Sequence, residues 1–187
     1  MAFGMCMHAQ VGPPQSTAPN TDNGYGFVQS TGTYTPLDAS KTIWQSGADL
    51  GTNAVSSEIT IPSFRFNGKT YTSIFISNNG FITFGKPAAA ATYTGLSTNS
   101  AVANLAEGAI AGFAANLVNA NTTTSEIAYQ TIGAKFIVQF TDLKVSGGSS
   151  AQLLNFQIQL DSSNNSIAIV YGNCVSGTST ATGQVGV

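Results

Sequence analysis

Apolar and polar residues alternate along several stretches of the chain. In Lys135–Leu143 and Leu153–Asp161 every second side chain is apolar, and the alternation returns in Ser166–Tyr171 after the polar turn Ser162–Asn165. A period of two is that of a β-strand with one face turned into a core. With β-branched and aromatic content added as a criterion, the expected strands are Tyr25–Ser30, Thr33–Leu37, Glu58–Phe66, Lys69–Ser77, Phe81–Gly85, Gly108–Val118, Ser125–Ile132, Lys135–Leu143, Leu153–Asp161, Ser166–Tyr171 and Gln184–Val187.

Turn signals separate these stretches. Asn67-Gly68 and Asn78-Asn79-Gly80 tolerate the positive φ of a tight turn, and Pro62 marks its stretch as an edge strand or a bulge. Gly108–Val118 is rich in Ala, which permits a helix, but its Gly residues and polar flanks favour a buried strand. Eight to eleven strands with a turn about every ten residues predict an all-β fold, an antiparallel β-sandwich of jelly-roll-like type.

Composition divides the chain into three parts. Residues 1–9 are apolar and Met-rich, and we interpret them as the remnant of a signal peptide cleaved after Ala9. The alternative is a leader with no signal role. Residues 10–23 are polar and Pro-rich, as in a linker. Residues 24–187 form the expected sandwich domain, and their end, Gln184–Val187, resembles the beginning of a strand, which is consistent with truncation at the C-terminus.

The charge pattern excludes two classes of partner. Charged residues make up 7% of the chain, against roughly 25% in a typical soluble domain. The six Lys and Arg residues are dispersed and form no stripe that could neutralise phosphates, so no nucleic-acid partner is expected. No apolar run approaches the roughly 20 residues of a membrane helix, so no membrane insertion is expected.

Side chains with catalytic chemistry are scarce. The single histidine is His8, in the expected leader, so the mature domain would lack the base of Ser-His-Asp and Cys-His catalysis and the usual ligand of catalytic zinc. Cys6 would leave with the leader. Cys174 is interpreted as a small hydrophobe, the alternative being a reactive thiol. Glu107 and Glu126 are a carboxylate pair that a glycosidase could use, but no spacing argument brings them together. We therefore expect no enzyme.

Candidate binding residues occur in polar, loop-like stretches. Trp44 and Tyr93, together with Asp49 and Asn53, offer the aromatic stacking surface and the hydrogen-bonding groups that a polysaccharide needs. The alternative is that Trp44 plugs one end of the core. Calcium is a possible cofactor, because Asp38, Asp49 and loop carbonyls are oxygen ligands. No D-x-D-x-D-G loop is present, so solvated loop acids are the competing interpretation, and no other cofactor is expected.

The most specific motif runs from Phe64 to Gly85. It resembles the signature F-x-(F/Y)-N-G-x-x-Y-x-x-(I/V)-x-(I/V)-S-x-N-G-(F/W)-(I/L)-x-F-G of N-terminal β-sandwich modules in secreted and surface proteins of Bacteroidetes, which are associated with type IX secretion. Its core, S-x-N-G-F-x-x-F-G at Ser77–Gly85, is also similar to a hairpin of nidogen-type extracellular modules. The resemblance extends over about Gly24–Val187 and supplies no catalytic residue.

This resemblance implies display outside the cell, as part of a longer polypeptide with further domains. The expected function is a non-catalytic structural or adhesive module of a secreted or cell-surface bacterial protein, whose partner is a polysaccharide or another cell-surface ligand. A carbohydrate-binding module that uses Trp44 and Tyr93 is the alternative, and a glycoside hydrolase is the third hypothesis.

Overall fold

The computed structural model describes residues 8–11, 27–51, 53–85, 108–178 and 183–187. They contain thirteen strands, one short 3-10 turn and no α-helix. In chain order the elements are β1 (His8–Val11), β2 (Phe27–Ser30), β3 (Thr42–Ser46), η1 (Gly47–Asp49), β4 (Ile59–Phe66), β5 (Lys69–Ser77), β6 (Phe81–Thr83), β7 (Ala109–Ala114), β8 (Leu117–Asn119), β9 (Glu126–Ile132), β10 (Lys135–Val145), β11 (Leu154–Asp161), β12 (Ser166–Tyr171) and β13 (Gln184–Gly186).

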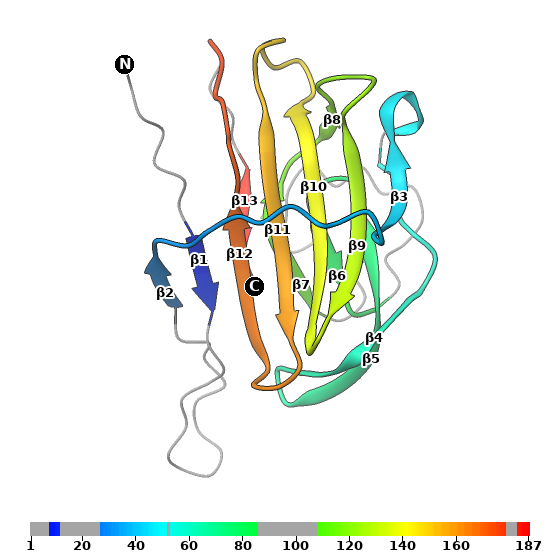
Figure 1. The fold of residues 1–187 in the computed structure, drawn as a ribbon, viewed down its shortest axis with the longest axis vertical. Coiled ribbons are helices and arrows are strands. Elements are labelled where there is room, and N and C mark those ends of the chain that lie inside the picture. The colour runs from blue at the N-terminus through cyan, green and yellow to red at the C-terminus, as the bar shows by residue number, and fades with distance from the viewer. Residues whose placement is uncertain (1–7, 12–26, 52, 86–107, 179–182) are drawn as a thin grey trace.

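Two antiparallel sheets pack against each other, which confirms the predicted all-β sandwich (Figure 1). The larger sheet has eight strands in the order β2-β1-β12-β11-β10-β9-β3, and β8 pairs with β10 off this path. The smaller sheet has five strands in the order β13-β7-β6-β5-β4. Strand pairing is antiparallel throughout the described residues, as expected for strands that are joined by short turns.

The hydrophobic core lies between the sheets, because alternate side chains of each strand turn toward the opposite sheet. The alternation predicted for β10 and β11 is confirmed, since their apolar positions belong to one buried cluster and the residues between them do not. From the larger sheet this cluster takes Phe136, Val138, Phe140, Leu154, Phe156, Ile158, Leu160 and Ile167, and from the smaller sheet Ile59, Ile61, Phe64, Phe66, Ile74, Ile76, Ile82 and Ile110.

The sheets approach each other closely at Phe156. Its ring stacks on that of Phe140 with 4.5 Å between centroids. It also faces the backbone of Gly112 in β7, where an added Cβ would lie 2.5 Å from the ring. The Tyr171 hydroxyl donates a hydrogen bond of 2.6 Å to the Gly112 carbonyl and so joins β12 to β7 across the core. Only glycine at position 112 allows this approach without displacing the aromatic ring.

One predicted strand is wrong and another is divided. Thr33–Leu37 forms no strand; it belongs to an extended segment, residues 31–41, that crosses the outer face of the larger sheet (Figure 1). Leu37 packs on that face against Ala128 and Ile137, so the stretch contacts the sheet without pairing as a strand. Gly108–Val118 is split into β7 and β8, because the chain passes here from the smaller sheet, where β7 pairs with β6, to the larger sheet, where β8 pairs with β10.

Two strands were not predicted. Thr42–Ser46 was assigned to a loop, but it forms β3 at one edge of the larger sheet, and a register shift between Ile43 and Gln45 obscures its alternation. His8–Val11 forms β1, which crosses the boundary between the expected leader and the expected linker and pairs with β12. The expected cleavage after Ala9 would divide this strand. Whether residues 1–9 are removed stays a prediction.

We predict that Phe156→Ala lowers the free energy of unfolding by about 3–5 kcal/mol, because it opens a cavity where the two sheets meet. The measurement is urea denaturation followed by circular dichroism. Ile132→Ala, at a side chain that is 49% exposed, is the control and should change stability by less than about 0.5 kcal/mol. Similar losses in the two variants would contradict the position assigned to the core.

Candidate functional site

The motif Ser77–Gly80 forms a buried polar centre between β5 and β6. Asn78 and Asn79 are both fully buried, so each polar atom of their side chains needs a partner inside the protein. Asn78 Oδ1 accepts a hydrogen bond of 2.8 Å from the Ala54 backbone N–H, and its Nδ2 donates to the Gly51 carbonyl. These bonds hold the segment that follows η1 against the smaller sheet.

Asn79 extends the same centre toward β8. Its Oδ1 accepts a hydrogen bond from the Leu117 backbone N–H, and its Nδ2 donates one of 2.8 Å to Asn53 Oδ1. Gly80 follows with φ of +85°. A Cβ at this position would lie 2.1 Å from the Phe113 carbonyl oxygen. The most specific motif of the sequence therefore holds the backbone of neighbouring segments in place, at Gly51, Ala54 and Leu117. The Asn53 side chain is a further partner of this motif.

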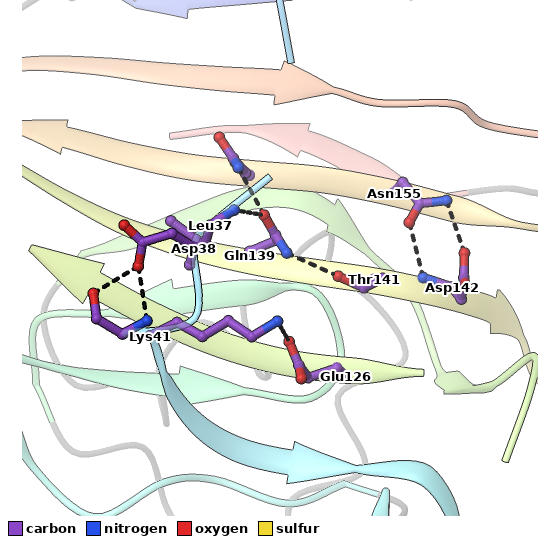
Figure 2. A network of polar contacts seen from close by, with 10 residues as sticks. Leu37, Asp38, Lys41, Glu126, Gln139, Thr141, Asp142 and Asn155 are labelled. Carbon is purple, nitrogen blue, oxygen red and sulfur yellow. Dashed lines mark hydrogen bonds and ion pairs between the residues drawn. The ribbon is translucent and has the colours of Figure 1, made fainter. Parts of the chain in front are cut away.

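A second polar cluster fixes residues 31–41 to the outer face of the larger sheet (Figure 2). Gln139 Oε1 accepts a hydrogen bond of 2.9 Å from the Leu37 backbone N–H and another of 2.9 Å from Gln157 Nε2. Gln157 Nε2 also donates to the Thr35 carbonyl at 2.8 Å, and Gln159 Nε2 donates to Gln157 Oε1 at 2.7 Å. These glutamines replace the hydrogen bonds that the crossing segment would otherwise make with water.

Sequence reasoning assigned no role to these glutamines, although a usable signal was present. Gln157 and Gln159 occupy the outward positions of an alternating strand, and Gln139 occupies the same face of the adjacent strand. Side chains opposite one another on a sheet face lie within reach of each other. A row of amides on one face therefore indicates a ladder that can bind a further segment of backbone.

Asp38 lies in the crossing segment just before the chain turns at residues 39–40, and its neighbours hold its side chain. Its Oδ1 accepts hydrogen bonds from the Ser40 hydroxyl at 2.6 Å, the Ser40 backbone N–H at 2.8 Å and Gln130 Nε2 at 2.8 Å. The bonds from Ser40, and then the one from Gln130, hold the pKa of Asp38 below its ordinary value of 3.8. Beside it, Lys41 Nζ forms an ion pair of 2.6 Å with Glu126 Oε1 (Figure 2).

A third cluster lies at the bulge of β10. Asp142 has φ of +48°, and its backbone N–H donates a hydrogen bond of 2.9 Å to Asn155 Oδ1 (Figure 2). Thr124 donates from its hydroxyl to Asp142 Oδ2 at 2.6 Å. The Cys174 thiol donates to the Asn155 carbonyl at 3.3 Å, and the protein atoms around the sulfur desolvate it and raise the pKa of this thiol. The residue as a whole is nevertheless exposed, so the prediction of a buried small hydrophobe is wrong.

The predicted binding residues that the structure describes, Trp44, Asp49 and Asn53, differ in their surroundings. Trp44 belongs to β3 and packs, partly buried, against the main core cluster, which agrees with the core alternative. Asn53 is bonded to Asn79, and Asp49 is exposed in η1. Tyr93 lies outside the described residues, as does Glu107, so the geometry of the pair formed by Glu107 and Glu126 is not defined.

The two calcium candidates belong to different surroundings. Asp38 directs Oδ1 to Ser40 and Gln130, whereas Asp49 lies in η1, after β3. Among the described residues, no group of three or more His, Cys, Asp or Glu side chains is placed to hold a metal ion. Calcium binding by these acids therefore stays a prediction from the sequence.

Comparison with known families gives one result. The family model described as NIDO related matches residues 24–187. The matched span includes the Ser77–Gly80 centre and the glutamine ladder, but not β1. Among curated proteins and among solved structures, no match was found.

We predict that Asn79→Ala destabilises the fold by about 1–3 kcal/mol, because the Leu117 N–H and the Asn53 side chain lose a buried partner. The measurement is the free energy of unfolding in urea. Asn164→Ala, in the exposed turn after β11, is the matched control and should cost much less. Equal losses of unfolding free energy in Asn79→Ala and Asn164→Ala would show that the buried Asn79 amide contributes no more than an exposed one.

We also predict a pH-dependent contribution from Asp38. A carboxyl whose pKa is lowered by folding adds stability above its ordinary pKa and loses it as the pH falls through the folded value. Wild type should therefore be more stable than Asp38→Asn at neutral pH. This difference in stability should be largest there and should shrink as the pH falls below about 3.8. Thermal melts across this range test it, with Asp49→Asn as the exposed control. A gap that does not change with pH would contradict the prediction.

Proposed function

The chain belongs to the NIDO-related family of extracellular-type structural modules, and from this premise we propose that it is a non-catalytic structural or adhesive module of a larger secreted or cell-surface bacterial protein. The signature at Phe64–Gly85 supports a parent of the kind exported by Bacteroidetes through type IX secretion. Among the described residues no helix is long and apolar enough to cross a membrane.

The observation that carries the proposal is that the buried polar side chains bind other parts of the same chain. Asn78, Asn79, Gln139 and Gln157 all bond to backbone or amide groups of the chain itself. A catalytic or sugar-binding site instead directs convergent polar groups into a cavity. In the described part of the chain, the conspicuous polar side chains hold segments together, which is what a structural module requires.

The competing functions find less support. Trp44 packs on the core cluster, which leaves less of its ring for stacking on a sugar. Glu126 is paired with Lys41 at 2.6 Å, so its carboxylate is already bound to the side chain that precedes β3 instead of being directed to a substrate. We therefore propose neither a carbohydrate-binding module centred on Trp44 nor a glycosidase that uses Glu126.

We predict that the purified module shows no retention on insoluble polysaccharides that depends on Trp44. The measurement is a pull-down with wild type and Trp44→Phe, a substitution that keeps an aromatic ring against the core. Specific retention in wild type that disappears in the folded variant would select the carbohydrate-binding alternative. Hydrolysis of the polymer that Glu126→Gln abolishes would select an enzyme.

The proposal also predicts that the module is displayed outside the cell, which can be measured separately. Protease treatment of intact cells should release or degrade the module, while a cytosolic marker stays intact. A module that becomes accessible only after the cells are lysed would contradict the proposal.

A further inference from the structure

The sheet edges of this sandwich differ in how they are protected. An exposed regular strand can pair with another chain, and proteins protect edges with prolines, charges and bulges. β4 carries Pro62 and a register shift between Thr60 and Phe64, and β3 has a shift between Ile43 and Gln45. β13 has a shift between its first and last residues. These three edges are irregular, which limits pairing with other chains.

β12 lies inside the larger sheet, between β1 and β11, and has no proline, charge or bulge. Its sequence, Ser-Ile-Ala-Ile-Val-Tyr, contains no charge and no proline. Its register is regular on both sides, over six residue pairs with β11 and four with β1. Ile167 and Ile169 are buried on its inner face, and Val170 is buried on the other. β12 therefore has the character of an interior strand, which needs a partner on each side.

The strand that covers β12 is weakly integrated into the fold. β1 lies outside the span that matches the family, residues 24–187. Its other neighbour, β2, pairs with β1 alone among the described strands. Of residues 28–36, which lie between the start of the described burial and Leu37, none belongs to the buried hydrophobic core. In Figure 1, β1 and β2 lie at the left-hand edge of the larger sheet, next to β12.

We propose that the edge of β12 is a strand-pairing site, which β1 covers within one chain and which pairs with β12 of a second copy when β1 is removed. The expected cleavage after Ala9 would leave only the pairings of Gln10 and Val11 with β12. The proposal does not depend on the function proposed above, because it concerns assembly alone.

A second copy suits this edge because β12 is complementary to itself. Two copies that meet antiparallel about a two-fold axis present the same strand to each other, and an uncharged strand places no like charges opposite one another. The ladder would continue through both larger sheets. Ala168 lies on the outer face next to the new contact and is half-buried, so a charge introduced there would lie close to its copy across the axis.

The test uses the full chain with Ala9→Pro and Gln10→Pro together. Adjacent residues of β1 bond to opposite neighbours, so two prolines remove donors on both sides and detach the strand. Thr17→Pro with Ala18→Pro, outside β1, is the matched control. Sedimentation should show a monomer for wild type and control, and a twofold higher mass for the β1 variant, increasing with concentration. A folded β1 variant that stays monomeric overturns the proposal.

Ala168→Lys locates the contact. Added to the β1 variant, it should restore the monomer with an unchanged circular dichroism spectrum, because the two lysines repel each other across the axis. A dimer of unchanged strength would place the contact elsewhere and overturn the proposal. A chain of residues 24–187 is the second variant, in case the prolines prevent folding. If both chains fail to fold, β1 is an essential part of the domain and not a removable cover, and the proposal is wrong.

Discussion

The close approach of the two sheets at Gly112 is the constraint on which the rest of the structure depends. β7 passes over the Phe156 ring at a distance that leaves no room for a Cβ, and the Tyr171 hydroxyl bonds to the Gly112 carbonyl. Because β7 must follow this path, the turn before β6 must accept its backbone, and Gly80 does so through hydrogen bonds from the Gly112 and Phe113 N–H groups to its carbonyl. Packing in the core thus determines where the Asn-Asn-Gly turn at Asn78–Gly80 is needed.

Neutral amides perform the work that ion pairs perform in more highly charged proteins. Asn and Gln side chains donate and accept at once, so one residue can satisfy both a carbonyl and an N–H. Gln157 does this between the Thr35 carbonyl, Gln139 and Gln159. A buried amide also needs no compensating charge. This explains how a chain with 7% charged residues can fix a segment across a sheet and a loop against a turn.

The sequence predicted local structure well and long-range roles poorly. Lys69–Ser77 and Ser166–Tyr171 were predicted with the observed bounds, because alternation and turn residues are local signals. Thr33–Leu37 was wrong because its partners lie on strands made much later in the chain. For the candidate site, Asn53 was found as a polar loop residue, but its role depends on Asn79, 26 positions away. Composition and periodicity contain no information about such pairs.

The segment that crosses the larger sheet has a consequence for biosynthesis. Leu37 bonds to a side chain 102 positions downstream and Thr35 to one 122 positions downstream. A ribosome therefore completes this segment long before β10 and β11 exist, and folding that relies on distant contacts is slow. The earliest part of the domain to emerge must wait, solvated and available to chaperones, until nearly the whole domain has been translated.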